Sequence, residues 1–167
     1  LLAFGVIFLV FISFDETYKK NYKSIYASAI NIGNLIISPL NKIENPLGNI
    51  FHGMKASDKG YNGFGEAYLS TVNYDIIKPW KKHLKMTLNL IVPVGKIRFV
   101  LFDDRADSST NGQFMDISLS MDNYSRLTIP PQIWVAFRGE DTPQNILLNI
   151  ANLEHNIEEV VRLELNK

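Results

Sequence analysis

The sequence contains no cysteine, and its 17 basic residues are balanced by 17 acidic ones. The absence of cysteine excludes disulfides, thiol nucleophiles and thiolate metal sites. A formal net charge of zero provides no long-range field that would attract nucleic acid, so we predict no nucleic-acid partner. The sequence also lacks a glycine-rich phosphate loop and a nucleophile elbow, which argues against the enzyme classes that depend on them.

Histidine is scarce as well. The three histidines, His52, His83 and His155, do not show the His-x-His and downstream glutamate spacing of a metal-binding cupin. A metal site needs three or four convergent ligands, so we predict neither a metal nor another cofactor. What the chain has in quantity is apolar sequence. Its 167 residues are 46% hydrophobic and 20% charged, as in an ordinary globular domain with one core.

The N-terminal residues differ from the rest of the chain. Residues 1–14 carry no charge, but they are fewer than the roughly 20 residues that span a bilayer. Three interpretations fit them: a truncated or re-entrant membrane segment, a signal-like segment, or an element buried in the domain or its dimer. Residues 15–32 have the apolar periodicity of an amphipathic helix, which packs on the domain or lies on a membrane surface. We therefore divide the chain into residues 1–32 and a domain over residues 33–167.

From Leu35 onward the apolar residues recur at every second position, as in half-buried strands. Met115, Ile117, Leu119 and Met121, for example, alternate with polar residues. The expected strands cover 35–38, 49–54, 64–72, 86–92, 97–101, 115–121, 124–129, 133–138 and 144–150. Short strands at intervals of about ten residues predict a mainly β domain, a sandwich or a barrel.

Three stretches of the domain carry a family resemblance. The first, residues 63–68, reads Gly-Phe-Gly-Glu-Ala-Tyr. The second, residues 77–113, contains Val-Gly-Lys-Ile-Arg-Phe-Val-Leu-Phe-Asp and ends in an Asp-x-Arg…Ser-Ser-Thr-x-Gly loop. The third begins Arg-Leu-Thr-Ile-Pro-Pro at residue 126 and continues to Trp134 and Phe137. Their order and spacing over residues 46–160 resemble the dTDP-4-dehydrorhamnose 3,5-epimerase family.

The resemblance has consequences for fold and ligand. It implies a double-stranded β-helix, that is, a cupin-like jelly roll, in addition to the N-terminal helix. It also implies a homodimer and a dTDP-linked 4-keto sugar bound in the barrel mouth, a common place for small ligands. Such an epimerase works in the cytoplasm, and residues 1–14 would associate it with a membrane if they form a membrane segment.

The chemistry that the resemblance implies needs several groups. A 3,5-epimerase removes a proton beside a ketone and returns one on the other face, using a base, a donor for the enolate and an acid. In the family these are a histidine oriented by an aspartate, a lysine and a tyrosine. Here the histidine position aligns with Lys81, the lysine position with Thr87 or Leu88, and the tyrosine position with Leu153 or Glu154. A further family histidine, in the Pro-Pro corner, aligns with Val135.

His83 stands two residues beyond Lys81 and would project from the same face of a strand. We therefore predict His83 and Lys81 as the catalytic pair. The alternative is that Lys81, Lys82 and Lys85 form a basic rim that binds a diphosphate. The predicted substrate-binding residues are Lys78, Lys85, Glu66, Arg126 and Trp134. Three of them have a simpler interpretation: Trp134 as core, Arg126 as a solvated strand-end charge, Glu66 as an exposed strand residue.

Two functions remain open at this point. One is a nucleotide-sugar epimerase or isomerase of surface-polysaccharide (O-antigen type) precursor synthesis, working by enolisation without a metal or redox cofactor. The other is a non-catalytic sugar-nucleotide binding module or assembly partner of glycan biosynthesis, which the substituted catalytic positions favour.

Overall fold

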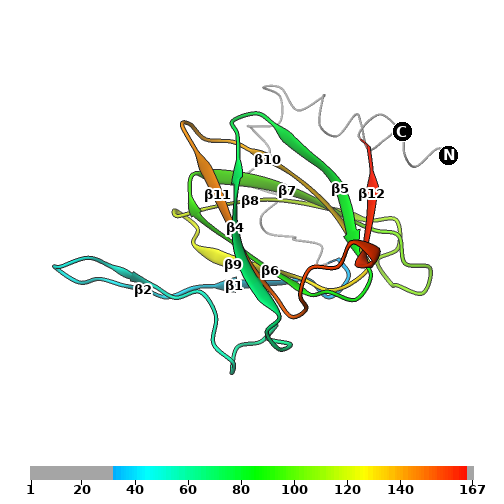
Figure 1. Cartoon of the computed structure of the whole chain (residues 1–167), viewed down its shortest axis with the longest axis horizontal. Helices are drawn as coiled ribbons and strands as arrows, with labels where there is room; N and C mark the ends of the chain where they lie inside the picture. Colours follow the sequence, from blue (N-terminus) through cyan, green and yellow to red (C-terminus); the bar gives the residue numbers. More distant parts are fainter. Residues whose placement is uncertain (1–31, 165–167) are drawn as a thin grey trace.

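The period-two segments fold into two antiparallel sheets that face each other (Figure 1). The computed structural model describes residues 32–164, so the predicted helix over 15–32 and the apolar residues 1–14 lie outside the described part. Within residues 32–164, no helix is long and apolar enough to cross a membrane. The prediction of a mainly β domain is confirmed.

The first sheet has the strand order β1-β9-β6-β11-β4, and the second has the order β12-β5-β10-β7-β8. The strands of the first sheet are β1 (Ile36–Pro39), β9 (Ser125–Ile129), β6 (Leu88–Val94), β11 (Asn145–Ala151) and β4 (Glu66–Val72). Those of the second are β12 (Val160–Leu163), β5 (Ile77–His83), β10 (Ile133–Gly139), β7 (Lys96–Asp103) and β8 (Phe114–Ser120). A small hairpin of β2 (Lys42–Ile43) and β3 (Ile50–Phe51) extends from the first sheet (Figure 1).

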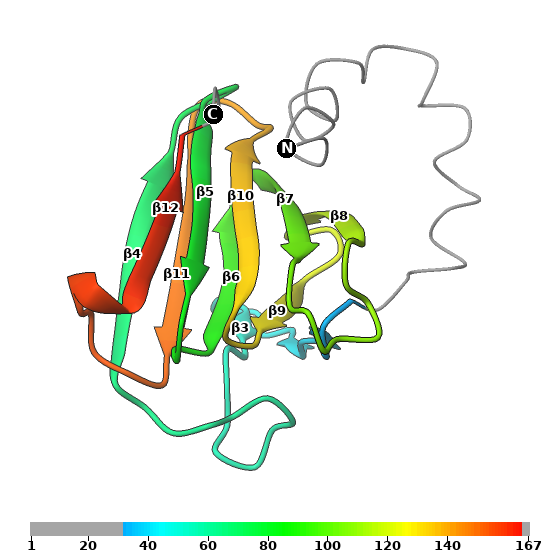
Figure 2. The ribbon, with the colours of Figure 1, turned by 90° about the vertical axis from the view of Figure 1, so that its right-hand side faces the viewer.

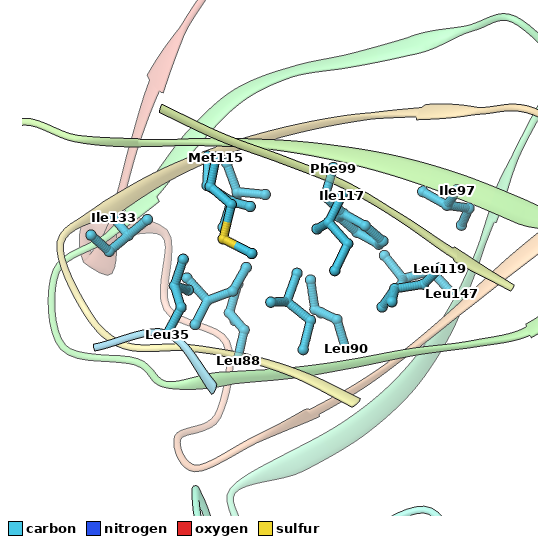
Figure 3. Close-up of a cluster of buried hydrophobic side chains, with 14 of the residues drawn as sticks. Leu35, Leu88, Leu90, Ile97, Phe99, Met115, Ile117, Leu119, Ile133 and Leu147 are labelled. Atoms are coloured by element: carbon cyan, nitrogen blue, oxygen red, sulfur yellow. The ribbon is translucent and has the colours of Figure 1, made fainter. Parts of the chain in front are cut away.

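The main core lies between the two sheets, where alternate residues of each strand point inward (Figure 3). On β7, Ile97, Phe99 and Leu101 are fully buried. The register pairs Phe99 with Ile117 of β8 and with Phe137 of β10, and paired residues share a face of the sheet. Leu88 and Leu90 supply the facing layer from β6 (Figure 3).

The opposite face of the second sheet carries a separate cluster of Trp80, Val100, Phe102, Trp134 and Ala136. These residues alternate with the inward-facing ones along β5, β7 and β10. Both faces of β7 and β10 are therefore largely buried, and the register decides which face each of their side chains occupies.

The loops between strands show which residues of the two sheets lie level with each other along the strand direction. Residues 73–76 join the end of β4 to the start of β5 at one end, the top of Figure 2. Residues 84–87 join the end of β5 to the start of β6 at the opposite end. β4 and β12 are the last strands of their sheets, so among the described residues the two sheets are not joined by a strand at this edge.

Nine of the observed strands correspond to the nine expected from periodicity. The predicted turn at Gly95 joins β6 to β7 with a φ of 75°, and a Cβ there would lie 2.5 Å from the Gln144 carbonyl oxygen. Periodicity did not predict β5, which only the family resemblance indicated, nor the short strands β2 and β12. The 3₁₀ helix η3 (Ile157–Glu159), directly before β12, was not predicted either.

Candidate functional site

A buried ion pair joins the end of β5 to η3. His83, the last residue of β5, is 7% exposed, and Glu159, the last residue of η3, is 8% exposed. The imidazole Nδ1 lies 2.6 Å from the Glu159 Oε2. The backbone amide of Leu84 also donates to the Glu159 carbonyl oxygen at 3.0 Å, so η3 is fastened to the end of β5.

The second carboxylate oxygen of Glu159 is occupied as well. Its Oε1 accepts the backbone amides of Lys85, at 2.5 Å, and Met86, at 2.7 Å. Burial alone would raise the pKa of Glu159, but these two amides and His83 hold the pKa below its ordinary value. Glu159 is therefore an ionised acceptor that fixes the ring of His83 from behind.

This arrangement determines the protonation of His83. Burial lowers the pKa of His83, and nearby Lys81 and His155 add to the decrease, although the Glu159 carboxylate opposes it. The imidazole is therefore neutral at pH 7. A carboxylate can only accept, so the single ring proton is on Nδ1 and the lone pair is on Nε2. A neutral histidine oriented by a carboxylate in this way has the chemistry that a general base needs.

Three cationic side chains lie on the inner face of the second sheet, and one of them, Lys81, lies near His83. Lys81 pairs with Val135 of β10 and Lys78 pairs with Phe137, and both of these partners face the interior core. Arg162 of β12 pairs with Lys81 from the other side. Burial lowers the pKa of Lys81, and the charges of Arg162 and Lys78 lower it further. The three cations lie on the same face as His83, and together their charges suit an anion.

The facing wall belongs to the first sheet. Glu66, Tyr68 and Ser70 of β4 pair with Ala151, Asn149 and Leu147 of β11. Asn149 and Ala151 are buried, so the β4 partners point inward too. We refer to Glu66, Tyr68 and Asn149 of the first sheet and Lys78, Lys81, His83 and Arg162 of the second as the polar edge.

The structure thus brings together His83, Lys81, Lys78 and Glu66 of the predicted site residues. It does not bring the other three to them. Trp134 faces the opposite side of the second sheet, where its Nε1 donates to Asp104 at 2.8 Å. Lys82 lies on that side as well, 4.6 Å from the centroid of the Trp134 ring, so it is not part of a basic rim with Lys81. Core packing is therefore the interpretation of Trp134 that the structure favours.

Arg126 faces outward on the first sheet and is only 1% exposed. Its guanidinium donates to the Asp58 carboxylate at 2.8 Å and to the carbonyl oxygens of Gly53 and Lys59 at 3.0 Å each. These contacts attach the 53–59 loop to the sheet, so we do not retain Arg126 as a ligand residue. Lys85 contributes its backbone amide to Glu159, while its side chain is exposed beyond the end of β5.

Sequence reasoning missed Glu159, Arg162, Tyr68 and Asn149. Glu159 stands 76 residues from His83, and no periodic pattern marks its segment. Tyr68 was part of a stretch carrying the family resemblance, but only its neighbour Glu66 was singled out. At the positions aligned with family catalytic groups, Thr87, Leu88 and Val135 are buried and uncharged. Leu153 is 38% exposed, and the neighbouring Glu154 is exposed too.

The loop around Asp103 lies outside the polar edge and has a structural role. Asp103 is fully buried and accepts hydrogen bonds from Arg105, Ser108 and Thr110, so its carboxylate holds the 103–110 loop together. Within residues 32–164, no group of three or more His, Asp or Glu side chains is arranged to hold a metal ion.

Two antiparallel sheets with a histidine-carboxylate pair and a cation cluster on their inner faces define the class of cupin-like proteins, with charges suited to an anion. A dTDP sugar isomerase from Desulfovibrio desulfuricans G20 has this fold with a TM-score of 0.77 and 32% sequence identity, over 80% of this chain and 86% of that one. The chain belongs to the dTDP-4-dehydrorhamnose 3,5-epimerase family of sugar-nucleotide epimerases and isomerases, and the cupin-like jelly-roll prediction is confirmed.

Two other relatives are more distant. The dTDP-6-deoxy-D-glucose-3,5-epimerase of Legionella pneumophila Philadelphia 1, solved with dTDP-4-keto-L-rhamnose, has a TM-score of 0.69 at 17% identity, over 80% of this chain and 74% of that one. A probable low-salt glycan biosynthesis epimerase of Haloferax volcanii is 26% identical over 84 residues, 50% of this chain. The match spans 54% of that relative, about half its length. No protein-family model matches the sequence.

Proposed function

We propose that the protein catalyses an enolisation of a dTDP-linked 4-keto-deoxysugar, as an epimerase or isomerase of surface-polysaccharide precursor synthesis. The observation that carries this proposal is the buried His83–Glu159 pair beside the three cations of the polar edge. The family membership and the sugar-nucleotide ligand of the Legionella epimerase support the choice of substrate class.

The residues have distinct roles in the proposal. His83 removes a proton from the carbon next to the ketone through its Nε2, and Glu159 stabilises the imidazolium that forms. Lys78, Lys81 and Arg162 bind the diphosphate, because a cluster of cations matches its two adjacent negative charges. Lys81 lies nearest to His83 in sequence and register, so it also disfavours a charged His83 before the substrate arrives. The reaction needs neither an oxidant nor a reductant.

The test is proton exchange into 4-keto-6-deoxyglucose linked to dTDP, followed by proton NMR in deuterated buffer. We expect the signal of the carbon-3 or carbon-5 proton to disappear with the wild-type protein. The substitution His83→Gln should slow the exchange by about 10²–10⁴-fold, the usual contribution of a general base. The matched control is His52→Gln, because His52 lies outside the polar edge, on the segment that packs on the outer face of the first sheet.

The second candidate is a binding module without turnover. The uncharged residues Thr87, Leu88 and Val135, at positions where the family has catalytic groups, favour it. Broadening of the nucleotide signals without any exchange, in the presence of every 4-keto sugar nucleotide offered, would establish this second function and exclude the first. The homodimer and the membrane contact of residues 1–14 stay predictions from the sequence.

A further inference from the structure

Directly opposite the cation cluster, the first sheet carries a buried amide and a tyrosine that contact each other. Asn149 of β11 is 1% exposed, and its Nδ2 donates to the Tyr68 hydroxyl oxygen at 3.1 Å. The Asn149 Oδ1 is also buried, and no donor within residues 32–164 reaches it. Tyr68 is 43% exposed, so its ring borders on solvent at the edge of the sheet.

The direction of this hydrogen bond leaves two groups available. Because Asn149 donates to the Tyr68 oxygen, the phenolic proton is not used by Asn149. A bond received at the oxygen also polarises the phenol, which makes its own proton a better donor. The Asn149 Oδ1 keeps its lone pairs. A buried carbonyl oxygen without a partner is costly, so an unfilled acceptor at this place indicates a ligand that donates to it.

The topology places Tyr68 and Asn149 level with Lys81 and His83 along the strand direction. Tyr68 lies four residues before Val72, where β4 ends, and Lys81 lies four residues after Ile77, where β5 begins. Residues 73–76 join these two ends, at the top of Figure 2. At 3.3 Å per residue, Tyr68 lies about 13 Å from the end of β4. Lys81 pairs three positions along β10 from the partner of Ile77, because the register is irregular between Lys78 and Lys81, so it lies about 10 Å from the start of β5. His83 lies one inward-facing position further along β5. Tyr68 therefore faces Lys81 and His83 from the opposite wall.

We propose that Tyr68 donates to the ketone oxygen of the substrate as the enolate forms, and that Asn149 positions Tyr68 and accepts from a neighbouring sugar hydroxyl. This inference rests on the proposed function. His83 takes the proton from the carbon beside the ketone, and the electron pair of that C–H bond becomes the carbon–carbon double bond. The carbonyl π pair moves onto the oxygen, which takes the Tyr68 proton. The enol proton then returns to Tyr68, and for an epimerisation the carbon takes a proton from solvent on its opposite face while His83 releases its proton to solvent, so the protons balance without an oxidant or a reductant.

Geometry requires the two groups to approach from different directions. The breaking C–H bond stands out of the carbonyl plane, whereas a donor to the oxygen lies near that plane. A base on the second sheet and a donor on the first meet this requirement. On the second sheet, Lys78, Lys81 and Arg162 are bound to the diphosphate in the proposal, so the donor for the enolate comes from the facing wall.

The experiment compares Tyr68→Phe with the wild type in the deuterium exchange described above. We expect the kcat for exchange to fall by about 10²–10³-fold, the usual loss for one oxyanion donor. Binding of dTDP alone, followed by thermal shift, should be unchanged, because Tyr68 contacts the sugar and not the diphosphate. The matched control is Tyr61→Phe, since Tyr61 is in the loop on the outer face of the first sheet and should keep full activity.

The outcomes separate the two proposals. If the wild type exchanges and Tyr68→Phe exchanges equally fast, the role of Tyr68 is wrong while the proposed function stands. If the wild type exchanges no proton of any 4-keto sugar nucleotide, both are wrong.

Asn149→Asp tests the positioning role, because aspartate keeps an acceptor but loses the Nδ2 donor. If Asn149 acts through Tyr68, the double variant with Tyr68→Phe should be no slower than Tyr68→Phe alone. Losses that multiply would overturn the positioning role.

Discussion

The interior of this sandwich has two halves with the same backbone geometry and opposite chemistry. Between β8, β9 and the middle of the sheets, inward positions hold Met115, Ile117, Leu119, Leu127 and Ile129, all buried. Toward β4 and β12, the inward positions belong to the polar edge. Burying unpaired charge is expensive, whereas apolar burial contributes about 25 cal/mol per Å². The apolar half therefore supplies the free energy that stabilises the fold. This free energy offsets the cost of burying the charged and polar side chains of the polar edge.

The largest effect on kcat should come from Glu159→Gln, a substitution that changes the polar edge and leaves the apolar half intact. In Glu159→Gln, the side-chain oxygen can still accept the Lys85 and Met86 amides, which turns the NH₂ group toward Nδ1 of His83. The ring proton must then move to Nε2, and the base is lost. We expect kcat to fall by about 10³–10⁴-fold with dTDP binding retained, as when a catalytic histidine is held in the wrong tautomer. Steady-state exchange kinetics would measure the loss, and a change below tenfold would contradict this role of Glu159.

The next largest effect should be a loss of stability from a substitution in the apolar half. Leu119 is 1% exposed and pairs with Ile97 across β7 and β8. Leu119→Ala removes buried methyl groups and leaves a cavity, so the free energy of unfolding should fall by about 2–5 kcal/mol. Urea denaturation would show this loss, while exchange activity per folded molecule stays close to wild type.

Leu69→Ala is the control for this substitution, because Leu69 of β4 is 64% exposed. It should change stability by less than about 0.5 kcal/mol. Loss of activity in folded Leu119→Ala would show that the two halves are not separable.

The smallest effect is a pH dependence of the free energy of unfolding, which should arise from the polar edge and not from the apolar half. The pKa of His83 is lower in the folded protein than its ordinary value of 6.5. The unfolded chain therefore binds more protons at His83, and stability falls as the pH drops below 6.5 toward the folded pKa. We expect urea midpoints to fall between pH 7 and pH 5.5 in the wild type and in His52→Gln. The fall should be smaller in His83→Gln. The pKa of Glu159 is also depressed, but its ordinary value of 4.5 keeps its contribution below this window.

The same two halves explain which predictions from the sequence held. Nine strands were found from apolar alternation, and seven of them, all except β1 and β3, place buried residues in the apolar core. β5 has no such alternation. Its inner face carries Lys78, Lys81 and His83, and its outer face carries Trp80 and Lys82, so neither face is uniformly apolar. Periodicity therefore could not identify the strand that holds the base.

The sequence by itself determined the mainly β class, the nine apolar strands and, through the order of three short stretches, the family. Local spacing also placed His83 and Lys81 on one face, because residues two apart on a strand always share a face. The partner of the base could not be predicted in this way. Glu159 meets His83 only because η3 and β12 return beside β5 from 76 residues away. Tertiary structure also decided that Arg126 and Trp134 face away from the site, because alternation shows which residues share a face of a strand but not which face the site will occupy.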